Sequence, residues 1–273
     1  MKITNHRFPE EEVPFKRTPN QGGAFDSGLP DTIIIHYTAG SSAESSIKTL
    51  CDKRTKASAH LVVGRDGSVT QLLPFNKIAW HAGKSAYGGR TGYNKYSIGI
   101  EIDNAGKLTK SGGQYIAWFG RVYPEEEVVE AVHRNESEPH YWHRYTEEQI
   151  ERVNDICADL IEAYGISSIL GHEEISPKRK VDPGPGFPLD KLRDRVLYRE
   201  RSDDGMEESV ISENLGIVTA SKLNIRSSPM LSASTVAAPL TQGTMVDIKK
   251  ESSGWYEVQV HTSGWVKKEY IRT

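Results

Sequence analysis

Residues 32–38 read Thr-Ile-Ile-Ile-His-Tyr-Thr (TIIIHYT), and this run of apolar, largely β-branched residues predicts a strand buried in a sheet. Thr146 and Gln149 have the spacing of a capping box, which predicts a helix start there. A hairpin predicted at 65–67 would make one strand pair antiparallel, so the pattern indicates an α/β fold with a mixed central β-sheet flanked by helices. The expected elements around the first strand are strands at 60–63, 69–73, 97–102 and 166–170, and helices at 43–53 and 147–164.

Composition restricts the class of protein. The chain has 273 residues, 37% hydrophobic and 26% charged, with a formal net charge of -3, so we expect a globular protein and no nucleic-acid partner. Its apolar runs are too short to cross a bilayer, which predicts no membrane insertion. The N-terminus lacks the apolar core of a signal peptide. We therefore expect a soluble protein made in the cytoplasm, and its final location and oligomeric state stay open.

A change in composition divides the chain into two parts. The stretch 199–213, RERSDDGMEESVISE, is polar and acidic with little to bury, and predicts a linker. Before it, 1–198 carries the alternating strands and helices. After it, 214–273 shows only short β-prone runs between Gly, Ser and Pro turns, which predicts a small all-β domain. The least regular segment, 103–144, is expected to be a long insertion beside the candidate site.

Three side chains of metal-binding type stand at ends of apolar runs. His36 closes the opening strand, His172 follows the short run ILG, and Asp182 lies before a Pro-Gly pair that favours a rigid loop. A single histidine at a strand end is more often structural. Two imidazoles and one carboxylate together leave a fourth position on Zn²⁺ open, which is the arrangement of a catalytic site.

Hydrolysis at such a site needs two further groups. Glu101, in SIGIEID, ends a buried strand and could take a proton from metal-activated water and pass it to the leaving group. Lys180, two residues before Asp182, could stabilise the oxyanion. Spacing alone leaves this constellation open to other interpretations.

Six segments make the interpretation more specific: IHYTAG, SAHLVVGRDGSVTQLLP, IAWHAG, NKYSIGIEI, ILGHEEISP and RKVDPGPGFP. In their order and local wording they resemble the amidase-2 family of N-acetylmuramoyl-L-alanine amidases, over roughly residues 3–197. The resemblance implies a mixed sheet flanked by helices, one Zn²⁺ per chain on His36, His172 and Asp182, and catalytic roles for Glu101 and Lys180. It also implies a peptidoglycan or muropeptide substrate, cut between N-acetylmuramic acid and L-alanine.

Two departures place the chain within that family. Phage-type members carry a tyrosine where this chain has Ala59, and phage-type and recognition-protein enzymes often use cysteine where it has Asp182. Together with Glu101, these differences make the chain resemble the AmpD branch, which includes cytoplasmic recycling amidases. The segments LNIRSSP, LTQGTMVDI, GWYEV and GWVKKEYI resemble bacterial SH3-like domains, which implies a small SH3-like barrel in 214–273 that binds the cell wall.

Four further residues are candidates for binding substrate: Tyr37, Trp80, His81 and Asn94. Trp80 could equally be core. His60 could support the site by hydrogen bonding to its groups, or could equally be a structural strand histidine. His140 and His143, in PHYWH, are better interpreted as part of a polar loop than as a second metal site. Three rival functions remain: a non-catalytic peptidoglycan receptor on the same fold, an adaptor that binds through its small domain, and a zinc peptidase acting on the stem peptide.

Overall fold

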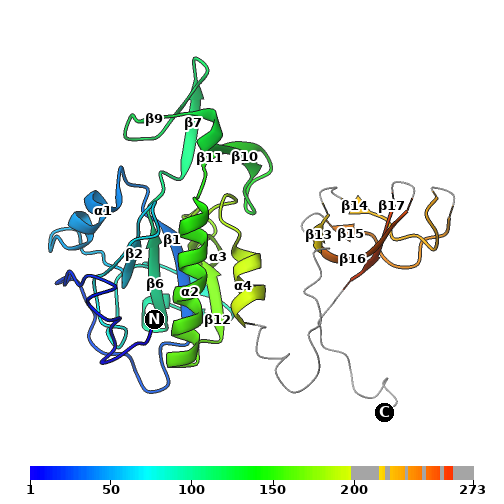
Figure 1. Ribbon diagram of the computed structural model, residues 1–273. Coiled ribbons are helices and arrows are strands. Elements are labelled where there is room, and N and C mark those ends of the chain that lie inside the picture. Colours follow the sequence, from blue (N-terminus) through cyan, green and yellow to red (C-terminus); the bar gives the residue numbers. More distant parts are fainter. Residues whose placement is uncertain (198–214, 219–221, 231–232, 242–243, 253–254, 261–273) are drawn as a thin grey trace, which may run out of the picture. The chain divides into compact units, whose positions relative to one another are not determined.

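Strand β1 (Thr32–Tyr37) lies inside the main sheet of the computed structural model, which describes residues 1–197, 215–218, 222–230, 233–241, 244–252 and 255–260 (Figure 1). The strand order is β12-β1-β6-β2-β3. Neighbouring strands are parallel except for β2 and β3, which pair antiparallel across the predicted hairpin. The predicted mixed sheet is therefore confirmed. The other four strands are β2 (Leu61–Val63), β3 (Val69–Gln71), β6 (Ser97–Ile102) and β12 (Ser168–Gly171).

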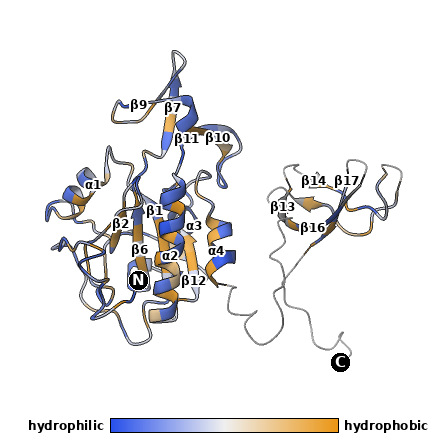
Figure 2. Cartoon of the chain, in the orientation of Figure 1, coloured by the Kyte–Doolittle hydropathy of each residue, from blue (hydrophilic) through white to orange (hydrophobic). Residues whose placement is uncertain are grey.

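One face of this sheet is covered by helices α2 (Glu147–Tyr164) and α4 (Leu189–Leu197). Because side chains alternate along a strand, Ile33 and Ile35 of β1 point to this face with Ile98, Ile100 and Ile102 of β6. Both helices show mixed hydrophobic and hydrophilic residues beside the hydrophobic β12 in Figure 2. Burial of these apolar stripes holds the helices on the sheet.

Helix α2 has the bounds that the sequence predicts. Thr146 accepts a hydrogen bond from the Gln149 backbone N–H, and the Gln149 side chain accepts one from the Thr146 N–H, so the capping box is present. Gly165 ends the helix with a φ of 65°, a left-handed conformation that glycine adopts without strain. Cys157 is fully buried among the helix–sheet contacts and is a free thiol.

The opposite face of the sheet carries shorter elements. Ile34 of β1 packs with Leu170, Ala82 and Tyr93, and Val62 of β2 packs beneath Ile47. His36 points to this second face because it lies two residues after Ile34 on the same strand. Glu101 points the same way because it is the register partner of His36 on β6. The elements around this face are α1 (Ala43–Leu50), β4 (Ala86–Tyr87), β5 (Arg90–Thr91), η1 (Tyr93–Lys95) and α3 (His172–Ile175).

The segment between β6 and α2 forms a second sheet with strand order β10-β11-β7-β8-β9. It has its own apolar cluster around Leu108, Tyr115 and Tyr123. The segment that holds His140 and His143 is strand β11, so its interpretation as a loop is wrong. Pairing with β10 and β7 orders it despite its polar side chains. The elements are β7 (Lys107–Ser111), β8 (Gln114–Ile116), β9 (Val122–Tyr123), η2 (Glu125–Glu127), β10 (Val128–Val132) and β11 (Pro139–His143).

The chain divides into two compact units, residues 1–204 and 205–273. The described part of the second unit is all-β, with sheet order β13-β16-β17 and a β14–β15 pair, as the sequence predicts. The predicted linker, 199–213, and the SH3-like segment GWVKKEYI, 264–271, lie outside the described residues. The strands are β13 (Leu215–Ile217), β14 (Lys222–Leu223), β15 (Leu240–Thr241), β16 (Met245–Ser252) and β17 (Trp255–Gln259).

Among the described residues, none of the helices combines the length and the apolar character that crossing a bilayer requires. Several predicted bounds differ from the observed ones by one to three residues at an end. The helix expected at 43–53, for example, ends at Leu50, with Cys51 as its C-cap residue.

Candidate metal centre

Strand register brings His36 and Glu101 together. The two residues are direct partners in the parallel β1–β6 pair, so their side chains leave the sheet side by side on the face opposite α2. His172 begins α3 directly after β12, the other neighbour of β1. Lys180 and Asp182 follow in the loop that runs back from α3. Four separate segments of sequence therefore meet at the ends of adjacent parallel strands.

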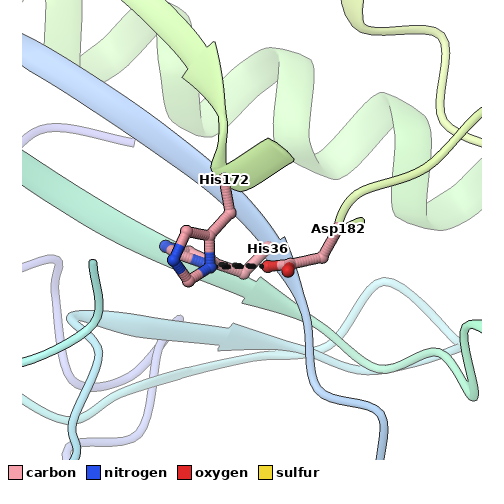
Figure 3. A group of neighbouring side chains, drawn as sticks. All are labelled: His36, His172 and Asp182. Atoms are coloured by element: carbon pink, nitrogen blue, oxygen red, sulfur yellow. Dashed lines mark hydrogen bonds and ion pairs between the residues drawn. The ribbon is translucent and has the colours of Figure 1, made fainter. Parts of the chain in front are cut away.

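The side chains of His36, His172 and Asp182 point toward one another in Figure 3. Nδ1 of His36 lies 2.9 Å from Nδ1 of His172, and each of these nitrogens lies 3.0 Å from Oδ2 of Asp182. All three residues are buried. Within the described ranges, this is the one group of three or more histidine, cysteine or acidic side chains whose ligand atoms are close enough to hold a metal ion.

A chain of hydrogen bonds through His81 fixes the ring proton of His36 on Nε2. Nε2 of His81 lies 3.2 Å from the Ser97 carbonyl, which can only accept, so this nitrogen carries the proton of His81. Burial holds the pKa of His81 well below its usual value, so the ring is neutral and its Nδ1 accepts from Nε2 of His36 at 2.9 Å. Nδ1 of His36 is therefore unprotonated, and its lone pair faces His172 and Asp182.

Backbone contacts orient the other two ligands. Nε2 of His172 lies 3.1 Å from the Ala82 carbonyl and donates to it, so its Nδ1 also presents a lone pair. The carbonyl of Asp182 accepts a hydrogen bond from the Glu173 backbone N–H at 2.8 Å. Burial alone would raise the pKa of Asp182, but the neighbouring rings of His172 and His36 lower it below its usual value, and the carboxylate stays charged.

The donor set fits zinc. Two imidazole nitrogens and one carboxylate oxygen are ligands that zinc takes in catalytic sites, where a fourth position stays open. Ligand atoms at ~2.0–2.1 Å from a tetrahedral ion are ~3.3 Å apart, close to the 2.9–3.0 Å separations here. Burial, and then repulsion from His172, lowers the pKa of His36 to about 4, so its ring is neutral and able to coordinate at pH 7.

Glu101 has a buried oxygen, Oε2, with no hydrogen-bond partner among the described residues. Burial raises the pKa of Glu101 well above its usual value, and the nearby charge of Asp182 raises it further. The charge of Lys180 acts in the opposite direction, which places that ammonium within electrostatic reach of the carboxyl. An unpaired buried carboxyl oxygen beside a cluster of metal-binding side chains is suited to exchange protons with a bound molecule.

A pocket of about 400 Å³ opens over these groups. It is lined by the three metal-binding side chains together with Glu101 and Lys180. Of the predicted substrate-binding residues, Tyr37, Trp80 and His81 line it, but Asn94 does not. The Asn94 side-chain oxygen instead accepts the backbone N–H groups of His81 and Ala82, so it holds the segment that carries His81.

The remaining histidines of the sequence analysis lie elsewhere. His60 accepts from the Gly99 N–H and contacts the Lys77 carbonyl, so it is a satisfied strand-end histidine. His140 lies 3.3 Å from Glu136, and His143 accepts the Ala105 N–H within the second sheet.

Two residues at the site were missed by sequence reasoning. Arg179 lines the pocket and donates to the carbonyls of Ala82 and Lys84, and its place beside Lys180 was the available signal. Gly99 leaves room for His81, because a Cβ there would lie 2.5 Å from the imidazole. The sequence gives no local signal for that contact.

Comparisons with known proteins identify a family and several relatives. The model of the family described as N-acetylmuramoyl-L-alanine amidase matches residues 26–185, and that of the bacterial SH3 domain matches 221–272. The N-acetylmuramoyl-L-alanine amidase AmiD of Escherichia coli (strain K12) is 34% identical over 169 residues, 59% of this chain and 51% of AmiD. The 1,6-anhydro-N-acetylmuramyl-L-alanine amidase AmpD of the same strain is 33% identical over 149 residues, 54% of this chain and 61% of AmpD.

The chain thus spans about half to three fifths of the length of these relatives. A crystal structure of a selenomethionine derivative of AmpD has a TM-score of 0.50 with this chain at 25% identity. That similarity covers 72% of this chain and 99% of the AmpD chain, which supports the fold of the first unit.

Proposed function

Because the chain belongs to the N-acetylmuramoyl-L-alanine amidase family, we propose that it hydrolyses the amide bond between N-acetylmuramic acid and L-alanine in peptidoglycan or muropeptides. One zinc ion per chain would be held by His36, His172 and Asp182. The observation that carries the proposal is the convergence of these ligand atoms beside the unpaired carboxyl of Glu101 at the wall of one pocket. Catalysis is assigned to the first unit.

Zinc, when bound, would polarise the scissile carbonyl and lower the pKa of a water molecule. Glu101 is the proton carrier: its carboxylate takes the proton of the attacking water and its carboxyl returns that proton to the amine of L-alanine. The raised pKa of Glu101 suits the second step, because its carboxyl keeps the proton at neutral pH until it passes it to the amine nitrogen as the C–N bond breaks. His81 and the Ala82 carbonyl keep the two imidazoles in the tautomer that this arrangement needs.

Lys180 supplies the positive charge for the oxyanion that forms at the scissile carbonyl. The ammonium lines the pocket and lies within electrostatic reach of Glu101. Loss of one such donor raises the barrier by ~2.7–4 kcal/mol in comparable sites. Tyr37 and Trp80 form apolar parts of the same wall and are assigned to substrate contact.

The second unit is proposed to hold the chain on the cell wall. The support is the match of its sequence to the bacterial SH3 domain and the all-β fold of its described residues. Such a role favours polymeric peptidoglycan over small fragments, and it requires that the protein reach the wall by export or release.

The test is to incubate the zinc-loaded protein with defined muropeptides, with and without a chelator, and to identify the new termini by mass spectrometry. We expect a free lactyl carboxyl on N-acetylmuramic acid and a free amine on L-alanine, both lost with the chelator. Glu101→Gln should retain zinc and lose turnover, whereas Glu151→Gln, on the exposed side of α2, should behave as wild type. Cleavage within the stem would make the protein a peptidase, and metal-independent binding without cleavage would make it a receptor.

A further inference from the structure

Hydrogen bonds attach the second sheet to the chain segments that directly follow the candidate zinc ligands His36 and His172. On one side, Nε1 of Trp118 donates to the Ala39 carbonyl at 2.7 Å and the Arg121 guanidinium donates to the Ser41 carbonyl at 3.0 Å, in the loop after β1. On the other side, His133 lies 2.7 Å from the buried carboxyl of Glu173, the residue after His172. Figure 1 shows β7 and β9 rising beyond the main sheet on this side. The second sheet therefore has a fixed position at the rim of the pocket.

Trp118 is the least buried large hydrophobic side chain found among the described residues, at 76% exposed. It stands at the tip of a tight turn, where the Gly120 N–H bonds to the Ala117 carbonyl. Turn tips are usually polar, so local structure gives no reason for an indole there. Its N–H is already bonded to Ala39 and the ring of Phe119 meets it edge to face at 5.7 Å. The indole is thus held in one orientation with its apolar surface in solvent.

The exposed indole lies next to the candidate active site. Thr38 and Ala39 line the pocket, and the Ala39 carbonyl accepts the hydrogen bond from the Trp118 indole N–H. The pocket volume of about 400 Å³ lies at the low end of the ~300–1,000 Å³ range of small-molecule sites. A glycan strand must therefore extend beyond the pocket, over its rim.

We propose that Trp118 is a binding platform for a sugar ring of the glycan strand, next to the N-acetylmuramic acid whose amide is cut. This inference rests on the proposed function and extends it to a substrate class: polymer rather than a single muramoyl peptide. A pyranose presents an apolar C–H face that matches a flat indole whose one polar group is already used. The carboxylates of a stem peptide would instead require a cation, and the guanidinium of Arg121, three residues after Trp118, is bonded to Ser41.

The experiment compares two substrates with the full zinc-loaded chain: glycan strands that carry stem peptides, and N-acetylmuramoyl-tripeptide with one sugar. In Trp118→Ala, KM for the strands should rise about tenfold, as expected for loss of one aromatic contact, with kcat and the KM for the single-sugar substrate unchanged. Trp118→Tyr keeps an aromatic face and should restore most of the affinity. The matched control Tyr87→Ala removes another exposed aromatic and should change neither KM.

Two outcomes would overturn the proposal. An equal rise in KM for both substrates would mean that Trp118 only supports the shape of the pocket, and a rise that follows stem length would mean a peptide subsite. Calorimetric binding of peptide-free glycan strands separates this inference from the proposed function. If amidase activity fails but Trp118→Ala still weakens glycan binding, the platform stands without the enzyme; if activity holds and binding is unchanged, the platform is wrong.

Discussion

Replacing His81 by leucine should weaken zinc binding without unfolding the protein. His36 is 1% exposed, and its Nε2–H donates to His81 at 2.9 Å. His81→Leu leaves this buried donor unpaired, which costs about 1–3 kcal/mol, and it releases the ring from the tautomer that presents Nδ1 to the metal. Loss of such a supporting hydrogen bond typically lowers metal affinity by about 10–100-fold, or about 1.4–2.7 kcal/mol.

The assay is competition for zinc between the protein and a chromophoric chelator at pH 7.5. His81→Gln retains a side-chain carbonyl acceptor and should recover part of the affinity. His140→Leu, in which a histidine side chain 40% exposed on the second sheet is replaced, is the matched control and should bind zinc as wild type does. Melting of the metal-free variants would verify that each is folded. Zinc affinity of His81→Leu within twofold of wild type would refute the reasoning, as would a rise in KM with unchanged zinc affinity.

Three further predictions follow from the packing and the buried histidines. Gly99→Ala puts a Cβ 2.5 Å from the His81 ring, so it should displace that ring and lower zinc affinity about tenfold in the same competition assay. Gly186→Ala, where the nearest atom to a Cβ is at an ordinary 3.5 Å, is the control and should leave zinc affinity unchanged. Burial lowers the pKa of His60 to about 4, so between pH ~6.5 and 4 the unfolded chain binds a proton at this residue that the folded chain does not bind. The free energy of unfolding should therefore fall by about 1.4 kcal/mol per pH unit from this group as the pH drops toward 4. When the free energy of unfolding in urea is plotted against pH over this range, the slope for His60→Gln should be smaller than that of wild type by the equivalent of one proton. Ile156→Ala opens a cavity at a fully buried position between α2 and the sheet and should reduce the free energy of unfolding by about 2–5 kcal/mol, and a loss below 1 kcal/mol would contradict this packing.

Local patterns were sufficient for the elements that the core buries. Helix α2 and strand β6 have the bounds expected from periodicity and from the Thr146 capping box, because those signals act between residues three or four positions apart. The second sheet could not be predicted in the same way. Its strands are short and partly polar, and pairing with distant strands orders them, as β11 pairs with both β10 and β7.

The same distinction between local and distant contacts applies to the candidate site. The sequence by itself determined which residue types end the strands: His36 after the isoleucine run, Glu101 at the end of the next parallel strand, and His172 and Asp182 around the last one. Only the tertiary structure decided that His81, 45 residues from His36, fixes its tautomer, that Asn94 holds the backbone of that segment, and that Trp118 stands at the rim. The physical reason is that these contacts depend on strand register and on a glycine that leaves space for a ring, and neither property is encoded in the residues adjacent in the chain.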